Sequence, residues 1–361
     1  MFERICELEH LFASHKLAQL DNRYKRKICA FTFSLEENLF HLRYELLRGF
    51  YLPRPYTYFT LHDPKTRAIA APDIRDRVVQ HALVSIIQPL FEKQFIYDSY
   101  ACRTNKGTHF AAKRLKRFLM AARCCHGKNV PLYVLQCDIR KFFQSISWEI
   151  LLTIIRKTVT CSRTMDLVET IVINHHSAVT LPKIPTPQLS LFDPVATTAE
   201  ASISVKTRTG LPIGNLTSQL FANIYLNELD HFVKDRLRVR YYARYMDDFL
   251  IIDPSLKHLK DLQKQIDTYL QSTLRLSLHP KKLTIKNVAT GVPFVGYRIF
   301  YDHILVRGVT LQRIERNYHS KIKQVKRGTF SEQKLTETKA SIRGHFKHAH
   351  TYGLAKKLFE T

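Results

Sequence analysis

The first 50 residues carry apolar positions at helical spacing. In the first run these positions are Leu8, Leu11, Phe12, Leu17 and Leu20. A second run covers residues 35–46, and Gly49 follows it shortly before two prolines. Apolar residues that recur in this way line one face of a helix, and a glycine just past the run is typical of a helix end. The pattern therefore predicts a helical segment over residues 1–50.

Alternating and β-branched stretches follow. Residues 56–61 and 67–72 predict two strands joined by a turn, and residues 73–83 open an amphipathic helix. A further helix is predicted from about His109 to Ala122, after Gly107, which allows the backbone to turn. The chain thus mixes helices with antiparallel strands, which indicates an α+β fold.

Two more apolar segments end in or enclose acidic residues. Residues 132–138 form an apolar run that ends at Asp138, and residues 242–252 predict a strand, a turn and a second strand around Asp247 and Asp248. Two adjacent carboxylates repel each other at low dielectric, so a divalent cation usually lies beside them. An isolated Asp-Asp pair is more simply an acidic hairpin turn. The third carboxylate favours a site for two Mg²⁺ ions that serves phosphoryl transfer.

Composition narrows the class of partner. Lys and Arg number 56 against 31 Asp and Glu, which gives a net charge of +25. This excess predicts a polyanionic partner, nucleic acid before membrane, although charge alone also fits passive binding. No run approaches the ~20 apolar residues needed to span a bilayer, and the N-terminus has no signal-peptide core. Seven cysteines without a Cys-x-x-Cys pattern indicate a reduced cytoplasmic protein without structural zinc.

The acidic motifs resemble those of a known family. Asp138 followed by Phe142-Phe143 resembles the first catalytic motif of reverse transcriptases, and Tyr245-Met-Asp-Asp248 resembles the second. The resemblance continues in order along nearly the whole chain. It implies a right-hand polymerase fold with an antiparallel palm sheet and a helical thumb. The implied divisions are an N-terminal extension (1–50), fingers (51–135 and 155–212), palm (136–154 and 213–302) and thumb (303–361).

The resemblance also implies the chemistry of the site. Asp138 and Asp247 would bridge two Mg²⁺ ions, for which Mn²⁺ can substitute, while Asp248 contributes charge or a ligand and the Ile139 carbonyl adds another. A primer 3′-OH would attack the α-phosphate of a deoxynucleoside triphosphate. Lys282, in a motif that supplies a lysine near the triphosphate, would act as general acid; a surface lysine is an equally good interpretation.

Further positions match family segments around the nucleotide and the duplex. The residues that the resemblance assigns to the nucleotide are Lys65, Arg67, Arg75, Phe143, Ile213, Gly214 and Gln219. Those assigned to template or primer are Arg103, Lys106, Ser218, Phe294, Gly296 and Tyr297. Phe143 stands at the steric gate that selects deoxynucleotides, although a core phenylalanine is the alternative. Surface cations are the alternative for the basic residues.

One segment departs from the commoner family pattern. Ile213-Gly214-x-x-x-Ser218-Gln219 looks like the variant of diversity-generating retroelement reverse transcriptases, which are error-prone opposite template adenines. Isoleucine in place of glutamine removes a hydrogen-bonding group near the templating base, so a loss of discrimination is physically reasonable. Retron and phage-defence reverse transcriptases are the enzymatic alternative, although residues 288–291 lack the retron Val-Thr-Gly signature. A non-catalytic RNA-binding scaffold is the remaining alternative, and the intact carboxylates speak against it.

Residues 174–208 predict a loop insertion rich in proline and polar residues. Within it, Gln188-Leu-Ser-Leu-Phe192 resembles the peptide that docks bacterial replication proteins on the sliding clamp. Leu189, Leu191 and Phe192 either fill a partner's apolar pocket or fold back onto the fingers.

The subgroup resemblance implies several partners for the chain. They are an RNA template, a DNA or RNA primer, deoxynucleoside triphosphates and a small basic helical accessory protein. A bacterial or phage-encoded cytoplasmic protein is expected. His345, His348 and His350 have spacings that suggest a metal, but duplex-facing or solvated histidines are the better interpretation.

Overall fold

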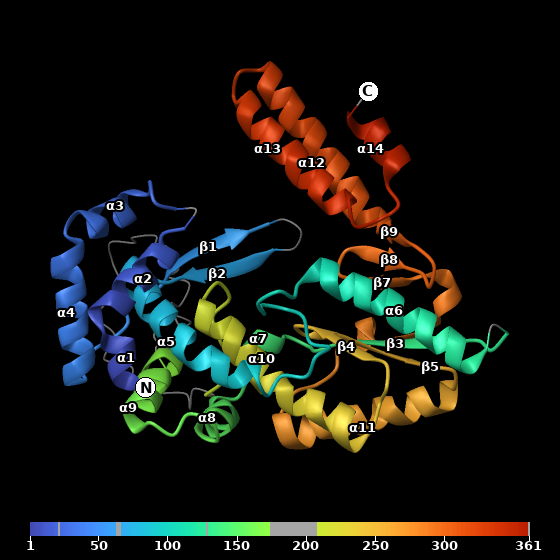
Figure 1. Cartoon of the computed structure of the whole chain (residues 1–361), viewed down its shortest axis with the longest axis horizontal. Helices are drawn as coiled ribbons and strands as arrows, with labels where there is room; N and C mark the ends of the chain where they lie inside the picture. The colour runs from blue at the N-terminus through green and yellow to red at the C-terminus, as the bar shows by residue number, and fades with distance from the viewer. Residues whose placement is uncertain (21, 63–65, 128, 174–207, 360–361) are drawn as a thin grey trace, which may run out of the picture. The chain divides into compact units, whose positions relative to one another are not determined.

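The computed structural model describes residues 1–20, 22–62, 66–127, 129–173 and 208–359. The chain folds into two compact units. The first unit comprises Met1–Phe95 and Lys141–Leu226, and the second comprises Ile96–Arg140 and Asn227–Thr361. Each unit is therefore assembled from two separate stretches of sequence (Figure 1).

The first unit is mostly helical. Its elements are α1 (Phe2–Cys6), α2 (Leu8–Ala18), α3 (Arg26–Phe33), α4 (Leu35–Arg48), β1 (Thr57–Leu61), β2 (Arg67–Ala71), α5 (Ile74–Glu92), α7 (Phe142–Ser145), α8 (Trp148–Arg156), α9 (Ser162–Ile173) and the start of α10 (Leu216–His231). Gly49 ends α4 in the left-handed conformation (φ 75°), and the Asp73 side chain caps α5 by accepting from the Arg75 amide. The helices predicted in residues 1–50 and the hairpin after them are confirmed.

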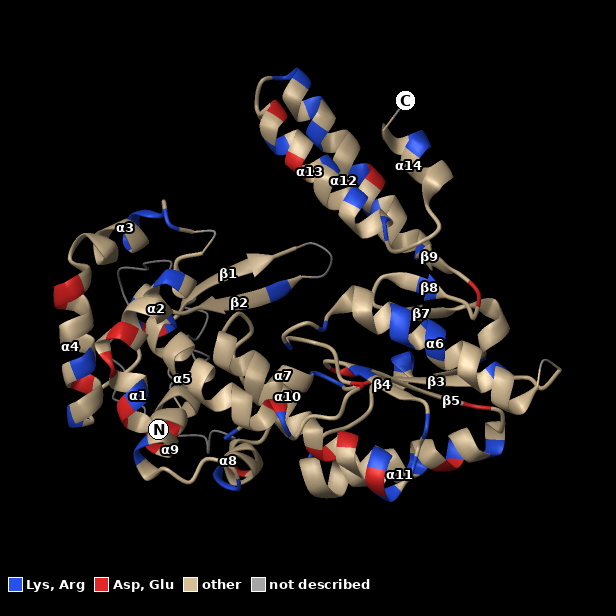
Figure 2. Cartoon of the chain, viewed as in Figure 1, with Lys and Arg blue, Asp and Glu red and all other residues tan. Residues whose placement is uncertain are grey.

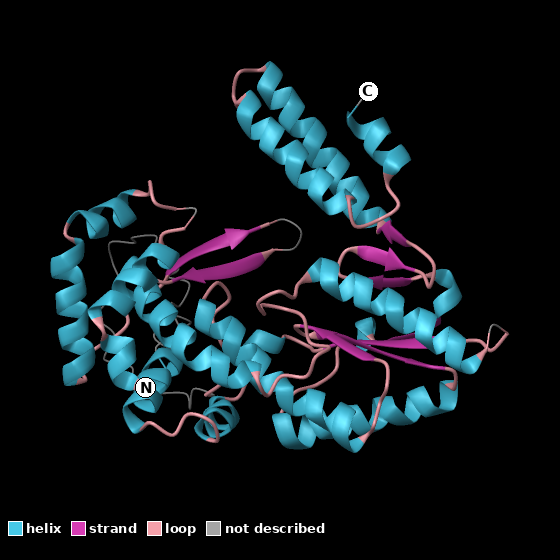
Figure 3. Ribbon diagram, in the orientation of Figure 1, coloured by secondary structure: helices cyan, strands magenta, loops and turns pink. Residues whose placement is uncertain are grey.

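The second unit contains the remaining elements. They are α6 (Thr108–His126), β3 (Tyr133–Asp138), the end of α10, a π-helix (Phe232–Arg236), β4 (Tyr242–Tyr245), β5 (Asp248–Asp253), α11 (Leu256–Leu274), η3 (Pro280–Lys282), β6 (Thr284–Asn287), η4 (Val288–Thr290), β7 (Val292–Phe294), β8 (Tyr297–Ile299), β9 (Ile304–Val306), α12 (Gly308–Lys326), α13 (Glu332–Phe346) and α14 (Tyr352–Phe359). Figure 3 distinguishes these helices from the strands.

A four-stranded antiparallel sheet organises the second unit. Its strand order is β4-β5-β3-β6. Helix α6 covers one face, where its apolar side packs with Val134, Leu250 and Ile252. Helix α11 contacts β3 and β5 from the other side, so the sheet lies between two helices (Figure 1). Side chains alternate along a strand, and both faces of β3 and β5 are apolar up to Asp138 and Asp248, apart from Gln136, which donates to the Pro293 carbonyl.

The chain after residue 290 begins with a small sheet of order β7-β8-β9. The helices predicted from about residue 303 are α12, α13 and α14, and a short strand that was not predicted, β9 (Ile304–Val306), precedes them and pairs with β8. These residues are apolar and alternate in burial, and the neighbouring strand supplies the partner that a local pattern does not reveal. Among the described residues, no helix is long and apolar enough to cross a membrane.

Candidate active site

A tight hairpin carries two of the three predicted carboxylates. β4 pairs with β5 so that Tyr245 faces Asp248, which leaves Met246 and Asp247 as the turn. Met246 has φ +55°, in the left-handed region that few non-glycine residues adopt. This conformation reverses the chain within two residues, as hairpin turns require. The strand, turn and strand predicted over residues 242–252 are confirmed.

The third carboxylate lies on the neighbouring strand. Asp138 is the last residue of β3, and its Cα partner in β5 is Asp248. Residues directly opposite each other in an antiparallel pair project from the same face, so both side chains leave the sheet on one side. The Ile139 amide donates to the Asp247 carbonyl over 3.3 Å, which fixes the turn to the end of β3. The sheet therefore brings Asp138, Asp247 and Asp248 together.

The carboxylates influence one another strongly. Protein atoms around Asp248 remove water from its carboxyl group, and it also hydrogen-bonds with Asp138 beside the Asp247 charge. These effects raise the pKa of Asp248 to about 7, while the Lys282 ammonium acts in the opposite direction. Lys282 Nζ forms an ion pair with Asp138 Oδ2. Thus the structure brings the predicted general acid to the carboxylates.

The donor set fits a hard divalent cation. Carboxylate oxygens are the ligands that Mg²⁺ and Mn²⁺ prefer. The raised pKa of Asp248 means that the metal-free protein holds more negative charge here than it accommodates without protonation, and a cation would relieve this repulsion. In the part of the chain that the structure describes, no group of three or more acidic, histidine or cysteine side chains could hold a metal ion by itself. A site completed by substrate phosphates and water is consistent with this open arrangement.

In the first unit, Ile213 and Gly214, which are predicted to bind the nucleotide, lie against β2. Another residue predicted to bind the nucleotide, Arg67, begins this strand. Ile213 accepts a hydrogen bond at its carbonyl from the Ala70 amide over 2.9 Å. At Gly214 (φ +118°) a Cβ atom would come within 2.8 Å of Ile69 Cγ2. Arg67 is exposed at the start of the same strand, β2. The glycine therefore permits a close backbone approach to β2.

The other predicted residues of the first unit have varied settings. Arg75 forms an ion pair with Glu45, and its side chain is only 13% exposed. Phe142 is buried, whereas Phe143 is half-buried, as expected if only the first is a core residue. On α10, Ser218 is buried and Gln219 is exposed. Lys65 lies outside the described residues, as do Gln188, Leu189, Leu191 and Phe192 with most of the predicted loop.

Arg103 and Lys106 stabilise the loop that precedes α6. Arg103 Nη1 donates to the Ile96 carbonyl (2.6 Å) and to Ser99 Oγ (2.7 Å). Lys106 Nζ donates to the Tyr97 carbonyl and lies 3.6 Å from the centre of the Tyr97 ring. The side chains of Arg103 and Lys106 therefore hold together the loop from which they are predicted to contact the template.

The predicted primer segment forms the hairpin of β7 and β8. Phe294 pairs with Tyr297, both rings are buried, and Gly296 sits in the turn at φ +89°. Support for a primer would therefore come from the hairpin backbone. His345 is not fully solvated, because its ring stacks on Tyr297 at 4.6 Å and is half-buried; that it faces a duplex stays a prediction. Tyr297 lies in the core, and this neighbour is not visible in the sequence.

A buried ion pair beneath the hairpin was not predicted. Arg244 on β4 is fully buried, and its Nη2 and Nε atoms lie 2.5 and 2.7 Å from the two carboxylate oxygens of Asp230. Tyr242 donates its hydroxyl hydrogen to the same carboxylate over 2.7 Å. The sequence did carry a signal of this ion pair, because an arginine within an apolar strand requires a buried partner. The partner, at the end of α10, could not be named from the strand alone.

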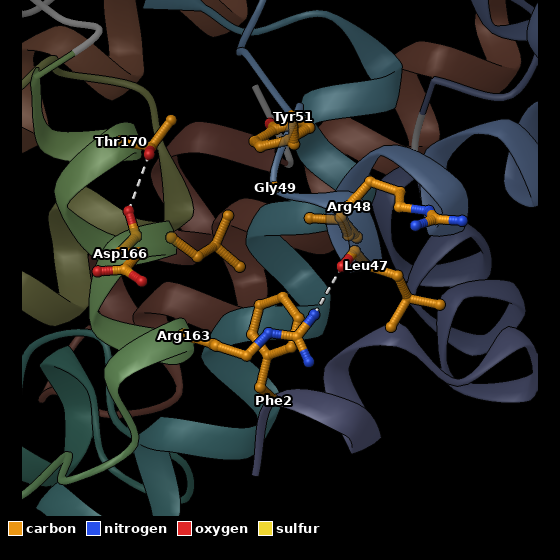
Figure 4. Close-up of a pocket in the computed structure, with 10 residues that line it drawn as sticks. Phe2, Leu47, Arg48, Gly49, Tyr51, Arg163, Asp166 and Thr170 are labelled. Carbon is orange, nitrogen blue, oxygen red and sulfur yellow. Dashed lines mark hydrogen bonds between the residues drawn. The ribbon is translucent and has the colours of Figure 1, made fainter.

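A pocket in the first unit contains none of the predicted site residues (Figure 4). Arg163 on α9 lies across the Phe2 ring, donates to the Leu47 carbonyl over 2.7 Å and pairs with Glu3. Figure 4 shows the guanidinium between α1 and α4. These contacts hold α1 and α4 against α9, which is a structural role.

Comparisons with known proteins agree with this geometry. The family model described as reverse transcriptase (RNA-dependent DNA polymerase) matches residues 62–299, about two thirds of the chain. Protein YkfC of Escherichia coli is 25% identical over 77% of this chain and 76% of its own length. The group II intron-encoded protein LtrA of Lactococcus lactis is 21% identical over 73% of this chain but only 50% of its own length.

A solved structure supports the fold. The apo telomerase of Candida tropicalis, truncated from its C-terminal domain, superposes with a TM-score of 0.50 and 14% identity. The similarity covers 76% of this chain and 60% of the telomerase chain. Together with the family match, it confirms the predicted right-hand polymerase fold, and reverse transcriptase domains generally use divalent metal ions. The chain belongs to the reverse transcriptase family and is an RNA-directed DNA polymerase.

Proposed function

We propose that the protein extends a DNA or RNA primer on an RNA template, and that Asp138, Asp247 and Asp248 hold two Mg²⁺ ions for this reaction. The observation that carries the proposal is the direct pairing of Asp138 with Asp248 at the acidic ends of β3 and β5. The Met246–Asp247 turn adds the third carboxylate beside them. In this proposal the division into extension, fingers, palm and thumb follows the boundaries inferred from the sequence.

The proposed mechanism is mainly one of positioning. Bound divalent ions would activate the primer 3′-OH and stabilise the departing pyrophosphate. Two hydrogen bonds fix the main chain at Asp138. The Asp138 carbonyl accepts from the His279 amide over 2.7 Å, and the amide of the next residue, Ile139, donates to the Asp247 carbonyl. Lys282 follows on η3, and we assign it the proton transfer to pyrophosphate because its ammonium already contacts Asp138.

We further propose that the enzyme is the error-prone polymerase of a diversity-generating retroelement. Ile213 offers an apolar side chain where a hydrogen-bonding group would help to read the template, and its carbonyl is already bound to β2. Discrimination that rests on a polar contact is lost when the contact is absent. Arg67, at the start of β2, would contact the triphosphate. The ring of Phe143 would exclude ribonucleotides and so select deoxynucleotides.

Charge supports the proposed partners. The net charge of +25 suits an RNA template and its duplex with DNA. Figure 2 shows Lys and Arg along α12 and α13, and α12 alone carries Arg313, Arg316, Lys321, Lys323 and Lys326. A small basic helical accessory protein, a sliding clamp bound by residues 188–192 and a location in the bacterial cytoplasm complete the proposal.

Primer extension on a defined RNA template, followed by sequencing of the cDNA, tests this function. Asp247→Asn is the control for the chemistry. Errors concentrated at template adenines would support the retroelement assignment. Faithful cDNA would instead favour a retron or phage-defence enzyme. No metal-dependent product, even with an accessory protein and its RNA, would leave an RNA-binding scaffold as the function.

A further inference from the structure

The buried Arg244–Asp230 pair reaches the catalytic turn. Besides its two bonds to Asp230, the Arg244 guanidinium donates from Nη1 to the Met246 carbonyl over 3.2 Å. Met246 is the residue with left-handed φ, directly before Asp247. One side chain thus joins the end of α10 to the turn that carries the carboxylates.

Two successive carbonyls of the turn are therefore held from different directions. The Met246 carbonyl accepts from Arg244, and the Asp247 carbonyl accepts from the Ile139 amide at the end of β3. Fixing both carbonyls fixes the two peptide planes that flank the Asp247 Cα atom, since each peptide unit is planar. The direction of the Asp247 Cα–Cβ bond follows from these two planes together.

The main chain of Arg244 is also held in place. Its amide donates to the Asp98 carbonyl and its carbonyl accepts from the Tyr100 amide, each over 3.0 Å. The guanidinium is planar and presents several N–H groups in a fixed arrangement, so its orientation is set once Asp230 binds it on two atoms. A lysine has no such arrangement.

From this geometry we propose that the Asp230–Arg244 pair is a positioning device for the catalytic carboxylates: it sets the Met246 peptide and thereby aims Asp247 at the metal ions. The proposal rests on the proposed function, including the metal ions that the carboxylates would hold, but metal binding can be measured whether or not a primer is extended. A buried ion pair is weak evidence for stability, because apolar residues of similar volume often replace one without loss. Positioning gives the pair a role that such replacements cannot fill.

Three variants separate positioning from folding. Tyr242→Phe is the matched control, because it removes one hydrogen bond to Asp230 and leaves the contact with Met246 intact. Arg244→Lys keeps a cation for Asp230 but replaces three donor nitrogens, which bind Asp230 and the Met246 carbonyl, by one. The triple variant Asp230→Leu/Tyr242→Phe/Arg244→Met removes the charges together, so that no buried charge remains unpaired.

The measurements are thermal unfolding, Mn²⁺ binding by electron paramagnetic resonance without nucleotide, and single-turnover extension at saturating deoxynucleotide. We expect Tyr242→Phe to bind Mn²⁺ and extend primers within about twofold of the wild type. In folded Arg244→Lys and triple variants, Mn²⁺ binding should weaken and the single-turnover rate should fall about tenfold to a hundredfold, as for misplaced catalytic groups. The nucleotide concentration for half-maximal rate should change by less than about threefold.

Wild-type Mn²⁺ affinity and rate in either folded variant would overturn the proposal. If the triple variant does not fold, Arg244→Lys alone decides. If the wild-type protein extends no primer, the proposed function fails, yet weaker Mn²⁺ binding by Arg244→Lys would still support the positioning role.

Discussion

Asp138 and Asp248 are direct partners across β3 and β5, so their carboxylates leave the sheet side by side. A shift of one residue between the two strands would send one of these side chains to the opposite face. The apolar faces that α6 and α11 cover enforce the register. Packing of the core therefore determines the geometry of the acidic site.

The carboxylates should be essential for synthesis but not for folding. We expect Asp138→Asn and Asp247→Asn to reduce single-turnover primer extension by on the order of a thousandfold or more, because the lost charge is needed in the transition state. Asp247→Asn should unfold at or above the wild-type temperature, since a repulsive contact is removed, whereas Asp138→Asn also loses the charge that pairs with Lys282. Asp253→Asn, at the opposite end of β5, is the matched control. Equal activity of Asp247→Asn and the control would contradict the assignment.

Metal binding should depend on pH through Asp248. Its folded pKa of about 7 lies above the unfolded value, so protonation stabilises the folded protein at low pH. This contribution is lost as the pH rises from about 4 through 7. Mg²⁺ should therefore raise the unfolding temperature more at pH 7.5 than at pH 5, as measured by calorimetry. Asp248→Asn should flatten that difference, and an unchanged pH dependence in this variant would count against the explanation.

Gly214 should tolerate no side chain. Gly214→Ala combines a left-handed φ with a Cβ atom 2.8 Å from Ile69 Cγ2, so we expect it to cost on the order of 2–3 kcal/mol in the free energy of unfolding. Gly107→Ala is the matched control, because Gly107 has nearly the same φ (+116°) and nothing within 4 Å. Denaturant unfolding of both variants measures the cost of the close approach. Equal losses would show that backbone strain alone is responsible.

The contact of His345 with Tyr297 should weaken in acid. Burial, together with the charges of His109, His348 and Arg313, lowers the pKa of His345. A lowered histidine pKa gives stability that is present above about pH 6.5 and is lost as the pH falls through the folded value. The unfolding temperature of wild type should therefore fall more steeply between pH 7 and 5 than that of His345→Gln. His350→Gln, at an exposed histidine, should behave like the wild type.

Ile213 offers a test of fidelity. We expect Ile213→Gln to lower misincorporation opposite template adenine by about tenfold, since a polar group restores discrimination by hydrogen bonding. Sequencing of cDNA from the wild type and the variant measures the error at each template base. Ile213→Leu, which stays apolar, should keep the wild-type spectrum. The same spectrum in all three proteins would remove Ile213 from the explanation.

Local sequence patterns were sufficient to predict the strands that carry the carboxylates. The apolar run before Asp138 and the aromatic flanks of Asp247 each specify a strand without reference to the rest of the chain. The helices before Gly49 could be predicted for the same reason. The order of motifs then identified the family, which supplied the fold.

Contacts between distant residues could not be predicted. Arg75 and Glu45 lie 30 residues apart, and nothing in either neighbourhood indicates the ion pair that they form. The same is true of Arg244 and Asp230, which lie on different elements. Strand β9 was missed because three residues carry too little periodicity, and only pairing with β8 makes them a strand.

The left-handed conformation of Met246 also bears on how this protein can be improved. A non-glycine residue in that region costs about 1–2 kcal/mol, and glycine would avoid the cost at φ +55°. Selection for thermostability alone would therefore favour glycine at this position, yet the turn carries methionine. A glycine here would also be freer to leave the left-handed conformation, so a stabilised enzyme is better sought by changing residues far from the hairpin.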